Sequence, residues 1–271
     1  MLKISQKSLI ISLVIYFWWT PLYSVNSVKD EVFLHPADAF TGFTLNRNDF
    51  IYNLPVLSIS PGWFWWGITD WITAEIDVEA NLGGVPSVNF RIKLLKTEKY
   101  NLAVETMFQY VPKSIELDYF KEDDGTDLSI KRWGSSWYNN LNLSVGPFKH
   151  SYIHLSGGVA YQKHLEILNR SDSTGISFDN FLFPHLSVGL DSRISSQVAL
   201  LFSASYGLTF TYLDNVPRKL QAVVAIRWAP LPNNRVGLLR NMRTEISCIY
   251  MCFPDVDKSL FTPMAYLYWQ W

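Results

Sequence analysis

His154 and Ser156 are the two residues whose types and spacing come nearest to catalytic chemistry. Side chains two positions apart on a β-strand lie on the same face. An imidazole and a hydroxyl placed in this way can act as base and nucleophile. The same spacing recurs at His185 and Ser187, which indicates that the pattern arises readily without a catalytic role. A hydrolase that uses His154 and Ser156 is therefore carried as an alternative function only.

Candidates for metal binding and for a disulfide are weaker. Asp123, Asp124 and Asp127 supply the oxygen ligands that a hard cation prefers, but no EF-hand spacing follows, so an acidic surface loop is the simpler interpretation. Cys248 and Cys252 lie four positions apart. On one strand their Cα atoms would be about 13 Å apart, beyond the ~7 Å limit for a disulfide. We expect neither a metal nor a cofactor.

The elements that would position these residues show an alternation of polar and apolar side chains. Between Ser87 and Leu94, one face carries Val, Phe, Ile and Leu, and the other carries Ser, Asn, Arg and Lys. Such alternation predicts a strand whose two faces meet different surroundings. The segment 71–80 behaves in the same way, whereas in 243–253 either face could be the apolar one. Further strands of this kind are expected at 102–110, 139–145, 151–161, 182–193, 198–212 and 220–228.

Three features separate this pattern from that of a soluble β-sandwich. The candidate strands run about 9 to 14 residues, longer than the usual ~5 to 6 and suited to a tilted strand that crosses a membrane. Aromatic residues gather at strand ends, as in 63–66, 133–138 and 266–271, where interfacial girdles form. Short connections are expected near 69–70, 96–101, 146–150, 193–197 and 231–235, and they alternate with long polar loops at 112–132, 163–179 and 213–218.

The carboxy-terminal segment carries the most specific pattern. Apolar positions alternate with other residues up to a terminal aromatic, at Phe261, Pro263, Ala265, Leu267, Trp269 and Trp271. This pattern resembles the carboxy-terminal signal of Gram-negative outer-membrane β-barrels, which the barrel-assembly machinery reads. The resemblance implies that Leu267, Trp269 and Trp271 form that signal. The segment 67–73 also resembles a periplasmic turn of uncharacterised barrels of this type. The resemblance extends over the mature chain as a pattern and carries over no functional residue.

A second, partial resemblance concerns the histidine–serine pair. Outer-membrane phospholipase and lipid A deacylase use a His-x-Ser pair on a barrel strand, followed by Asn, and that pair faces lipid. Here Gly157 takes the place of the Asn, and alternation turns His154 and Ser156 toward the lumen. The chain therefore departs from the pattern of these enzymes in two respects.

The amino terminus has the features of a signal peptide, residues 1–24. Lys3 and Lys7 precede an apolar run that suits a signal-peptide core and is too short to span a bilayer as a helix. Cleavage is expected after Ser24 or Ser27. An uncleaved membrane anchor is the alternative.

The mature chain is expected to be an all-β protein, an antiparallel up-and-down transmembrane β-barrel over residues 49–271 with a periplasmic lead-in at 28–48. About twelve strands are expected, with ten as the alternative. Their expected ranges are 49–58, 62–69, 71–80, 86–95, 101–111, 135–146, 150–162, 181–193, 197–212, 218–229, 242–253 and 261–271.

In a membrane barrel the polar face of each strand points into the lumen. The charged residues expected there are Glu75, Asp77, Glu79, Arg91, Lys93, Glu105, Asp191, Arg193 and Arg227. Antiparallel pairing about the connections near 80–85 and 96–101 places Arg91 between Glu75 and Glu105. About eight strands give a filled barrel and about 16 to 18 an open one. Twelve strands lie between these limits, so the sequence is compatible with both an open channel and a plugged interior.

The net charge and the fraction of charged residues exclude some classes of function. A net charge of −1 leaves no basic footprint for nucleic acid. Charged residues make up 17% of the chain, below the roughly 25% of typical soluble domains. We expect a monomer in the bacterial outer membrane, reached after secretion across the inner membrane, with lipid, lipopolysaccharide and the barrel-assembly machinery as partners. The expected role is passive passage of small polar solutes. The alternatives are a lipid hydrolase or deacylase, and a structural or adhesive barrel acting through its extracellular loops.

Overall fold

The computed structural model describes residues 41–56, 62–121, 127–148, 150–170, 174–207, 220–252 and 259–271. The predicted signal peptide and most of the predicted lead-in lie outside these residues and stay predictions. The same holds for the acidic run at 123–126 and the predicted loop at 213–218.

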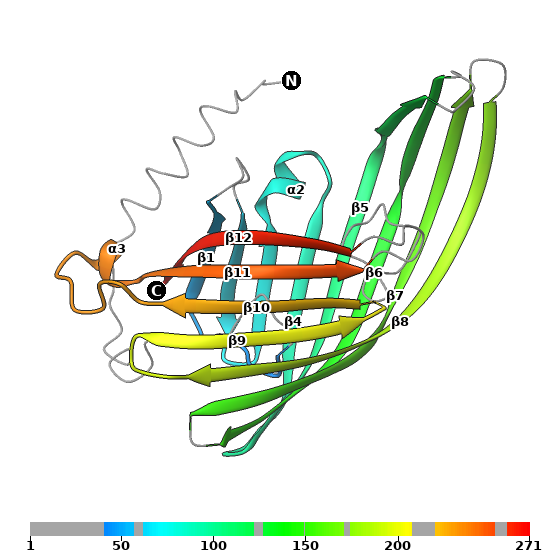
Figure 1. Cartoon of the computed structure of the whole chain (residues 1–271). Coiled ribbons are helices and arrows are strands. Elements are labelled where there is room, and N and C mark those ends of the chain that lie inside the picture. The colour runs from blue at the N-terminus through cyan, green and yellow to red at the C-terminus, as the bar shows by residue number, and fades with distance from the viewer. Residues whose placement is uncertain are drawn as a thin grey trace.

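Twelve strands of the described chain form one closed antiparallel barrel (Figure 1), in the order β1-β12-β11-β10-β9-β8-β7-β6-β5-β4-β3-β2. The predicted fold class and the count of twelve strands are confirmed. The strands are β1 Phe50–Pro55, β2 Trp63–Thr69, β3 Ile72–Asp77, β4 Ser87–Lys96, β5 Tyr100–Lys121, β6 Asp127–Phe148, β7 Ser151–Arg170, β8 Thr174–Arg193, β9 Val198–Tyr206, β10 Leu220–Trp228, β11 Met242–Cys252 and β12 Ser259–Gln270.

One end of the barrel, here called the turn end, holds the connections β2–β3, β4–β5, β6–β7, β8–β9 and β10–β11. Three of these turns are built in the same way. The hydroxyls of Thr69, Thr97 and Ser195 each accept hydrogen bonds from the backbone N–H groups two and three positions later in the chain. Side-chain hydroxyls thus satisfy backbone groups that a tight turn leaves without strand partners. The opposite end is called the loop end.

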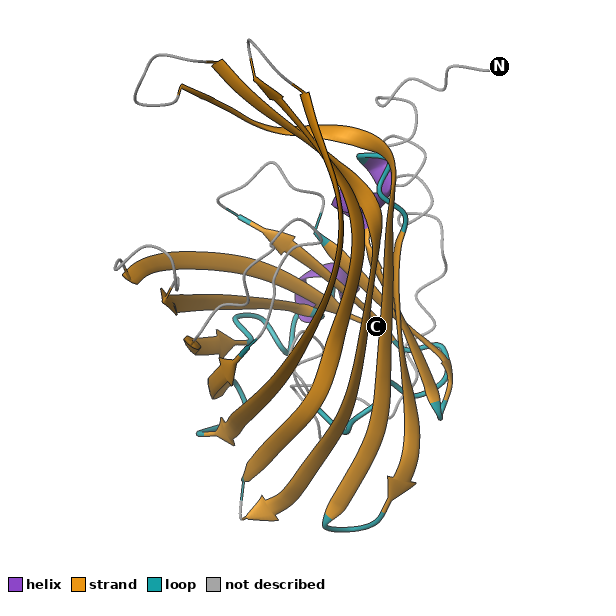
Figure 2. Cartoon of the chain, turned by 90° about the vertical axis from the view of Figure 1, so that its right-hand side faces the viewer, coloured by secondary structure: helices purple, strands orange, loops and turns teal. Residues whose placement is uncertain are grey.

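Four strands are much longer than expected. β5 and β6 have 22 residues each, and β7 and β8 have 20 each. The segments 112–132 and 163–179 were predicted as loops, but most of each belongs to these strands, so that prediction is wrong. Twenty-two residues span roughly 70 Å, more than a tilted strand needs to cross a ~30 Å hydrocarbon core. The two hairpins therefore extend past the other strands at the loop end (Figure 2).

A short helix interrupts the third predicted strand. β3 ends at Asp77, and α2 follows at Val78–Leu82. An Asp77 carboxylate oxygen accepts a hydrogen bond from the backbone N–H of Ala80 at 2.9 Å, which is the geometry of a helix N-cap. The predicted strand 71–80 therefore extends three residues too far at its C-terminal end. A second short helix, α3 at Gly237–Arg240, lies in the β10–β11 connection. No helix among the described residues is long and apolar enough to cross a membrane.

The two faces of the wall have opposite character. Large apolar side chains are exposed on the outside, among them Leu141, Leu155, Val188, Phe202 and Val224. Polar side chains are buried on the inside, among them Asn89, Glu105, Asn142, Gln221 and Glu245. This arrangement is the inverse of a soluble protein and suits a barrel whose outer face meets lipid.

A charged substitution should destabilise the barrel more on its outer face than on its inner face. Val223 and Val224, neighbours in the middle of β10, allow the two faces to be compared at the same depth. Val224 faces outward with 55% of its surface exposed, and Val223 faces the interior. We expect Val224→Arg to lower the free energy of unfolding by about 2–4 kcal/mol, since the charge would enter hydrocarbon. Val223→Arg should cost much less. Denaturant titrations of both variants in lipid vesicles measure the difference, and equal costs would contradict the assigned faces.

Candidate functional site

A buried ion pair joins β4 and β5 on the inner face. Arg91 lies opposite Glu105 in the strand register, as the sequence predicted. An Arg91 guanidinium nitrogen lies 3.2 Å from a Glu105 carboxylate oxygen, and each side chain exposes only 7% of its surface. Charges removed from water to this degree are stable only when they are paired and hydrogen-bonded. The pair therefore ties these two strands to one register.

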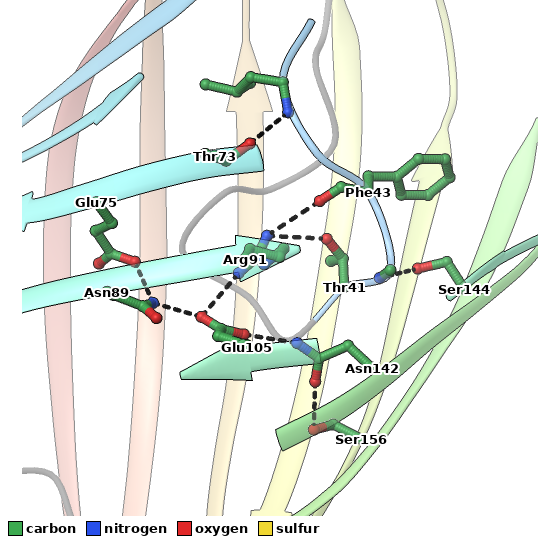
Figure 3. A network of polar contacts seen from close by, with 12 residues as sticks. Thr41, Phe43, Thr73, Glu75, Asn89, Arg91, Glu105, Asn142, Ser144 and Ser156 are labelled. Atoms are coloured by element: carbon green, nitrogen blue, oxygen red, sulfur yellow. Dashed lines mark hydrogen bonds and ion pairs between the residues drawn. The ribbon is translucent and has the colours of Figure 1, made fainter. Parts of the chain in front are cut away.

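Glu75 does not lie opposite Arg91, and this part of the prediction is wrong. Glu75 pairs with Asn89, two positions earlier on β4. The observed register differs from the expected one by two residues, which keeps each side chain on its face because the strand period is two. The Asn89 amide donates hydrogen bonds to Glu75 at 2.8 Å and to Glu105 at 2.6 Å (Figure 3). An asparagine, and not an arginine, bridges the two carboxylates.

The network continues onto the neighbouring strands. The second oxygen of Glu105 accepts a hydrogen bond from the Asn142 amide at 2.6 Å, and the Asn142 carbonyl accepts one from the Ser156 hydroxyl at 2.6 Å. The Glu105 carboxylate thus accepts hydrogen bonds from three side chains, those of Asn89, Arg91 and Asn142. These bonds offset the free-energy cost of burying the carboxylate. The chain of contacts from Glu75 to Ser156 crosses β3 to β7 (Figure 3).

His154 and Ser156 lie on the inner face but bond to different residues. Ser156 donates its hydroxyl hydrogen to Asn142, so that hydrogen is not directed at His154. The His154 Nδ1 lies 2.8 Å from the Ser144 hydroxyl. Both side chains are buried inside the barrel, away from the outer face that a lipid substrate would contact. This geometry gives the hydrolase alternative no support.

A second charged cluster lies on β10, β11 and β12. The Nε and a terminal nitrogen of Arg227 donate to one Glu245 oxygen at 2.9 and 2.7 Å, and both side chains are almost fully buried. The Arg227 guanidinium also lies 4.2 Å from the ring centroid of Tyr268, a favourable cation–π contact. Arg243 is buried beside them and donates to the backbone carbonyls of Arg240 and Met242.

Sequence reasoning found Arg227 and missed Glu245, Arg243 and Tyr268. Alternation in 243–253 was ambiguous, because aliphatic and small residues occur on both faces of that segment. A usable signal was nevertheless present, since Arg243, Glu245 and Ser247 occupy every second position and all three are buried on the inner face.

The other predicted lumen residues have mixed placements. Asp191 is buried on the inner face, and Arg193 is half-buried at the end of β8. Lys93 is buried at the turn end, where its ammonium donates to the Asp70 carbonyl and lies 5.8 Å from the Trp71 ring centroid. Asp77 caps α2, and Glu79 lies within that exposed helix, so strand alternation does not place Glu79 in the lumen.

Residues 41–46, here called the inner segment, lie against the inner wall at the turn end. The Gly42 N–H donates to the Ser144 hydroxyl at 2.7 Å, and the Leu45 N–H donates to the Thr73 hydroxyl at 2.8 Å. Arg91 donates to the Thr41 hydroxyl at 3.3 Å and to the Phe43 carbonyl at 3.4 Å (Figure 3). The sequence predicted only a periplasmic lead-in at 28–48 and gave no sign of these contacts.

A cavity of about 300 Å³ lies beside the inner segment. Its wall includes the charged side chains Arg91, Lys93, Lys96 and Glu98, together with Asn101 and Tyr152. Metal-binding geometry is absent, since no group of three potential ligands among His, Cys, Asp and Glu occurs in the part of the chain that the structure describes. Cys248 and Cys252 are both free thiols.

The pair of Arg227 and Glu245 should show strong energetic coupling. We expect Arg227→Ala and Glu245→Ala each to lower the free energy of unfolding by about 3–5 kcal/mol, because each leaves a buried charge without its partner. The double variant should lose much less than the sum. Glu98 and Lys99, both exposed in a turn, supply a control cycle with coupling below about 1 kcal/mol. Additive losses at Arg227 and Glu245 would contradict the pairing.

Comparison with known proteins finds likeness in structure alone. No protein-family model matches the chain, and no curated protein matches it in sequence. The outer-membrane protein OmpT of Vibrio cholerae is similar, with a TM-score of 0.43 and 8% identity, over 77% of this chain and 64% of that chain. The translocator domain of the autotransporter NalP from Neisseria meningitidis has a TM-score of 0.46 and 10% identity, over 82% of this chain and 86% of that one. The toluene transporter TodX of Pseudomonas putida has a TM-score of 0.38 and 9% identity, over 81% and 69%. The closure of this chain into twelve strands and its apolar outer face stand independently of these likenesses.

Proposed function

We propose that the protein is a passive channel for small polar solutes in the bacterial outer membrane. The observation that carries this proposal is the contrast between the faces of the wall, which is apolar outside and lined inside by buried charged and amide side chains. A polar inner face of this kind is what a water-filled passage requires. The turn end would face the periplasm, as the short turns of such barrels do.

The inner wall favours small solutes without a strong preference for the sign of their charge. Arg91 is paired with Glu105, and Arg227 is paired with Glu245. Paired charges of opposite sign give no extended field of one sign that would concentrate anions or cations. We therefore expect hydrogen bonding and size, more than charge, to determine which solutes pass.

Conductance tests the proposal directly. The refolded protein in a planar bilayer should produce small single-channel steps with weak ion selectivity. Glu245→Gln removes the charge that balances Arg227, so it should increase the anion preference. Glu79→Gln removes an exposed charge from α2 and serves as the control, with selectivity unchanged. A correctly folded protein without conductance would contradict the proposal. It would instead favour the structural or adhesive alternative, for which the long β5–β8 hairpins are the supporting observation.

The proposed assembly signal has its own test, because Trp271 also closes the barrel. The backbone N–H groups of Trp271 and Phe50 donate to each other's carbonyls at 2.9 Å. Trp271→Ser keeps both backbone bonds and removes the aromatic ring. We expect little assembled, heat-modifiable protein in cells and near-normal refolding in detergent. Trp271→Phe should assemble like the parent. Normal assembly of Trp271→Ser would refute the signal, and failed refolding in detergent would show a structural role instead.

A further inference from the structure

We propose that the inner segment, residues 41–46, forms the constriction of the passage, and that the Thr73 and Ser144 hydroxyls, together with Arg91, hold it there. This inference rests on the proposed channel function and names the element that would limit the size of the solute. The segment crosses the inner faces of neighbouring strands at the turn end, where any solute moving through the lumen must pass.

Polar contacts fasten the segment to three different strands. Its backbone N–H groups donate to hydroxyls on β3 and β6, those of Thr73 and Ser144. Arg91 on β4 divides its guanidinium between the wall and the segment. One terminal nitrogen lies 3.2 Å from Glu105, and the other donates to Thr41 and Phe43. The guanidinium fork suits this double task, because its donors point in fixed and different directions.

Apolar contacts fasten the same segment from the other side. Leu45 is buried in a cluster with Ile51, Trp65 and Tyr268, which belong to β1, β2 and β12. The Phe43 ring lies edge-on to the Tyr152 ring on β7, with 5.3 Å between centroids. The segment therefore has anchors on both sides of the lumen, and this distinguishes it from a chain end that lies loosely in the opening.

The backbone approaches so closely that the sequence must supply glycine. A Cβ atom on Gly42 would lie 1.9 Å from the Asn101 carbonyl oxygen, which is possible only if the segment moves away from β5. On β2, a Cβ atom on Gly67 would lie 1.8 Å from the Asn46 carbonyl oxygen. Glycines at both points of contact allow the segment to lie directly on the wall.

The cavity beside the segment would be the narrow part of the path. The Asn101 side chain is 5% exposed and lines this cavity. Its carbonyl oxygen has no hydrogen-bond partner among the described residues. That oxygen is itself shielded from the cavity, so a solute there would meet the exposed Lys96 and Glu98 side chains instead. The constriction would thus present charges of both signs to a passing solute.

The experiment separates release of the segment from conduction. In the full chain, Thr73→Val with Ser144→Ala removes both hydroxyl acceptors of the segment. Gly42→Ala displaces the segment by steric contact alone. The control is Thr106→Val with Ser151→Ala, which removes hydroxyls that bond to Asn139 and Ser192 and do not contact the segment. Amide hydrogen exchange at Gly42 and Leu45 reports whether the segment is bound, and single-channel conductance reports the width of the passage.

We expect both amides to be protected in the parent and in the control. In the double variant, exchange should accelerate roughly twenty-five-fold, since each of the two neutral hydrogen bonds contributes about a fivefold factor. Conductance should rise in the double variant and in Gly42→Ala, while the control conducts like the parent.

Unprotected amides in the parent would overturn the inference. The inference would also be overturned if the parent conducts and the variants release the segment but show the same conductance as the parent. That result would leave the channel proposal intact. If neither the parent nor the released variants conduct, the channel proposal fails, and the constriction fails with it.

Discussion

A bilayer offers no hydrogen-bond partner to the backbone, and the architecture of this protein depends on that constraint. Every N–H and C=O group at membrane depth must be paired within the protein, so a sheet in lipid has to close. Here β1 and β12 close it, and Trp271 and Phe50 exchange backbone hydrogen bonds beyond the last strand pair. The Tyr52 and Trp269 rings stack across this seam with 6.0 Å between their centroids. Closure creates an inner face that lipid does not reach.

The inner face then meets a second constraint, which is the cost of burying charge. The ion pairs Arg91–Glu105 and Arg227–Glu245 each join adjacent strands, and Glu105 also accepts hydrogen bonds from Asn89 and Asn142. Such pairs contribute little net free energy relative to apolar side chains, but loss of one partner is costly. Their effect is therefore on register. A shift of β4 against β5 would separate Arg91 from Glu105 and leave both charges buried without their partners.

The two ends of the barrel differ in construction. Short hydroxyl-stabilised turns and the inner segment occupy the turn end, whereas the β5–β8 hairpins continue past the other strands at the loop end. A passage through this molecule would be narrow near the turn end, where Leu45 and Gly42 contact the wall. It would be bordered at the loop end by the long hairpins (Figure 2).

The sequence by itself determined the barrel, because alternation along a strand depends only on which face meets lipid. It predicted twelve strands, the polar inner face and the pairing of Arg91 with Glu105 across a short turn. It did not predict the length of β5–β8, since hairpin pairing outside the membrane requires no apolar face. The place of Glu75 depended on the β3–β4 connection, which holds α2 and pairs Glu75 with Asn89 instead of Arg91. Glu245 carried a signal in the alternation of Arg243, Glu245 and Ser247, but its pairing with Arg227 depended on the register of the β10–β11 connection. The position of residues 41–46 was decided only by the tertiary structure. It brings together residues that lie far apart in the chain, such as Gly42 and Ser144, and no local periodicity indicates which inner surface a non-repeating segment will contact.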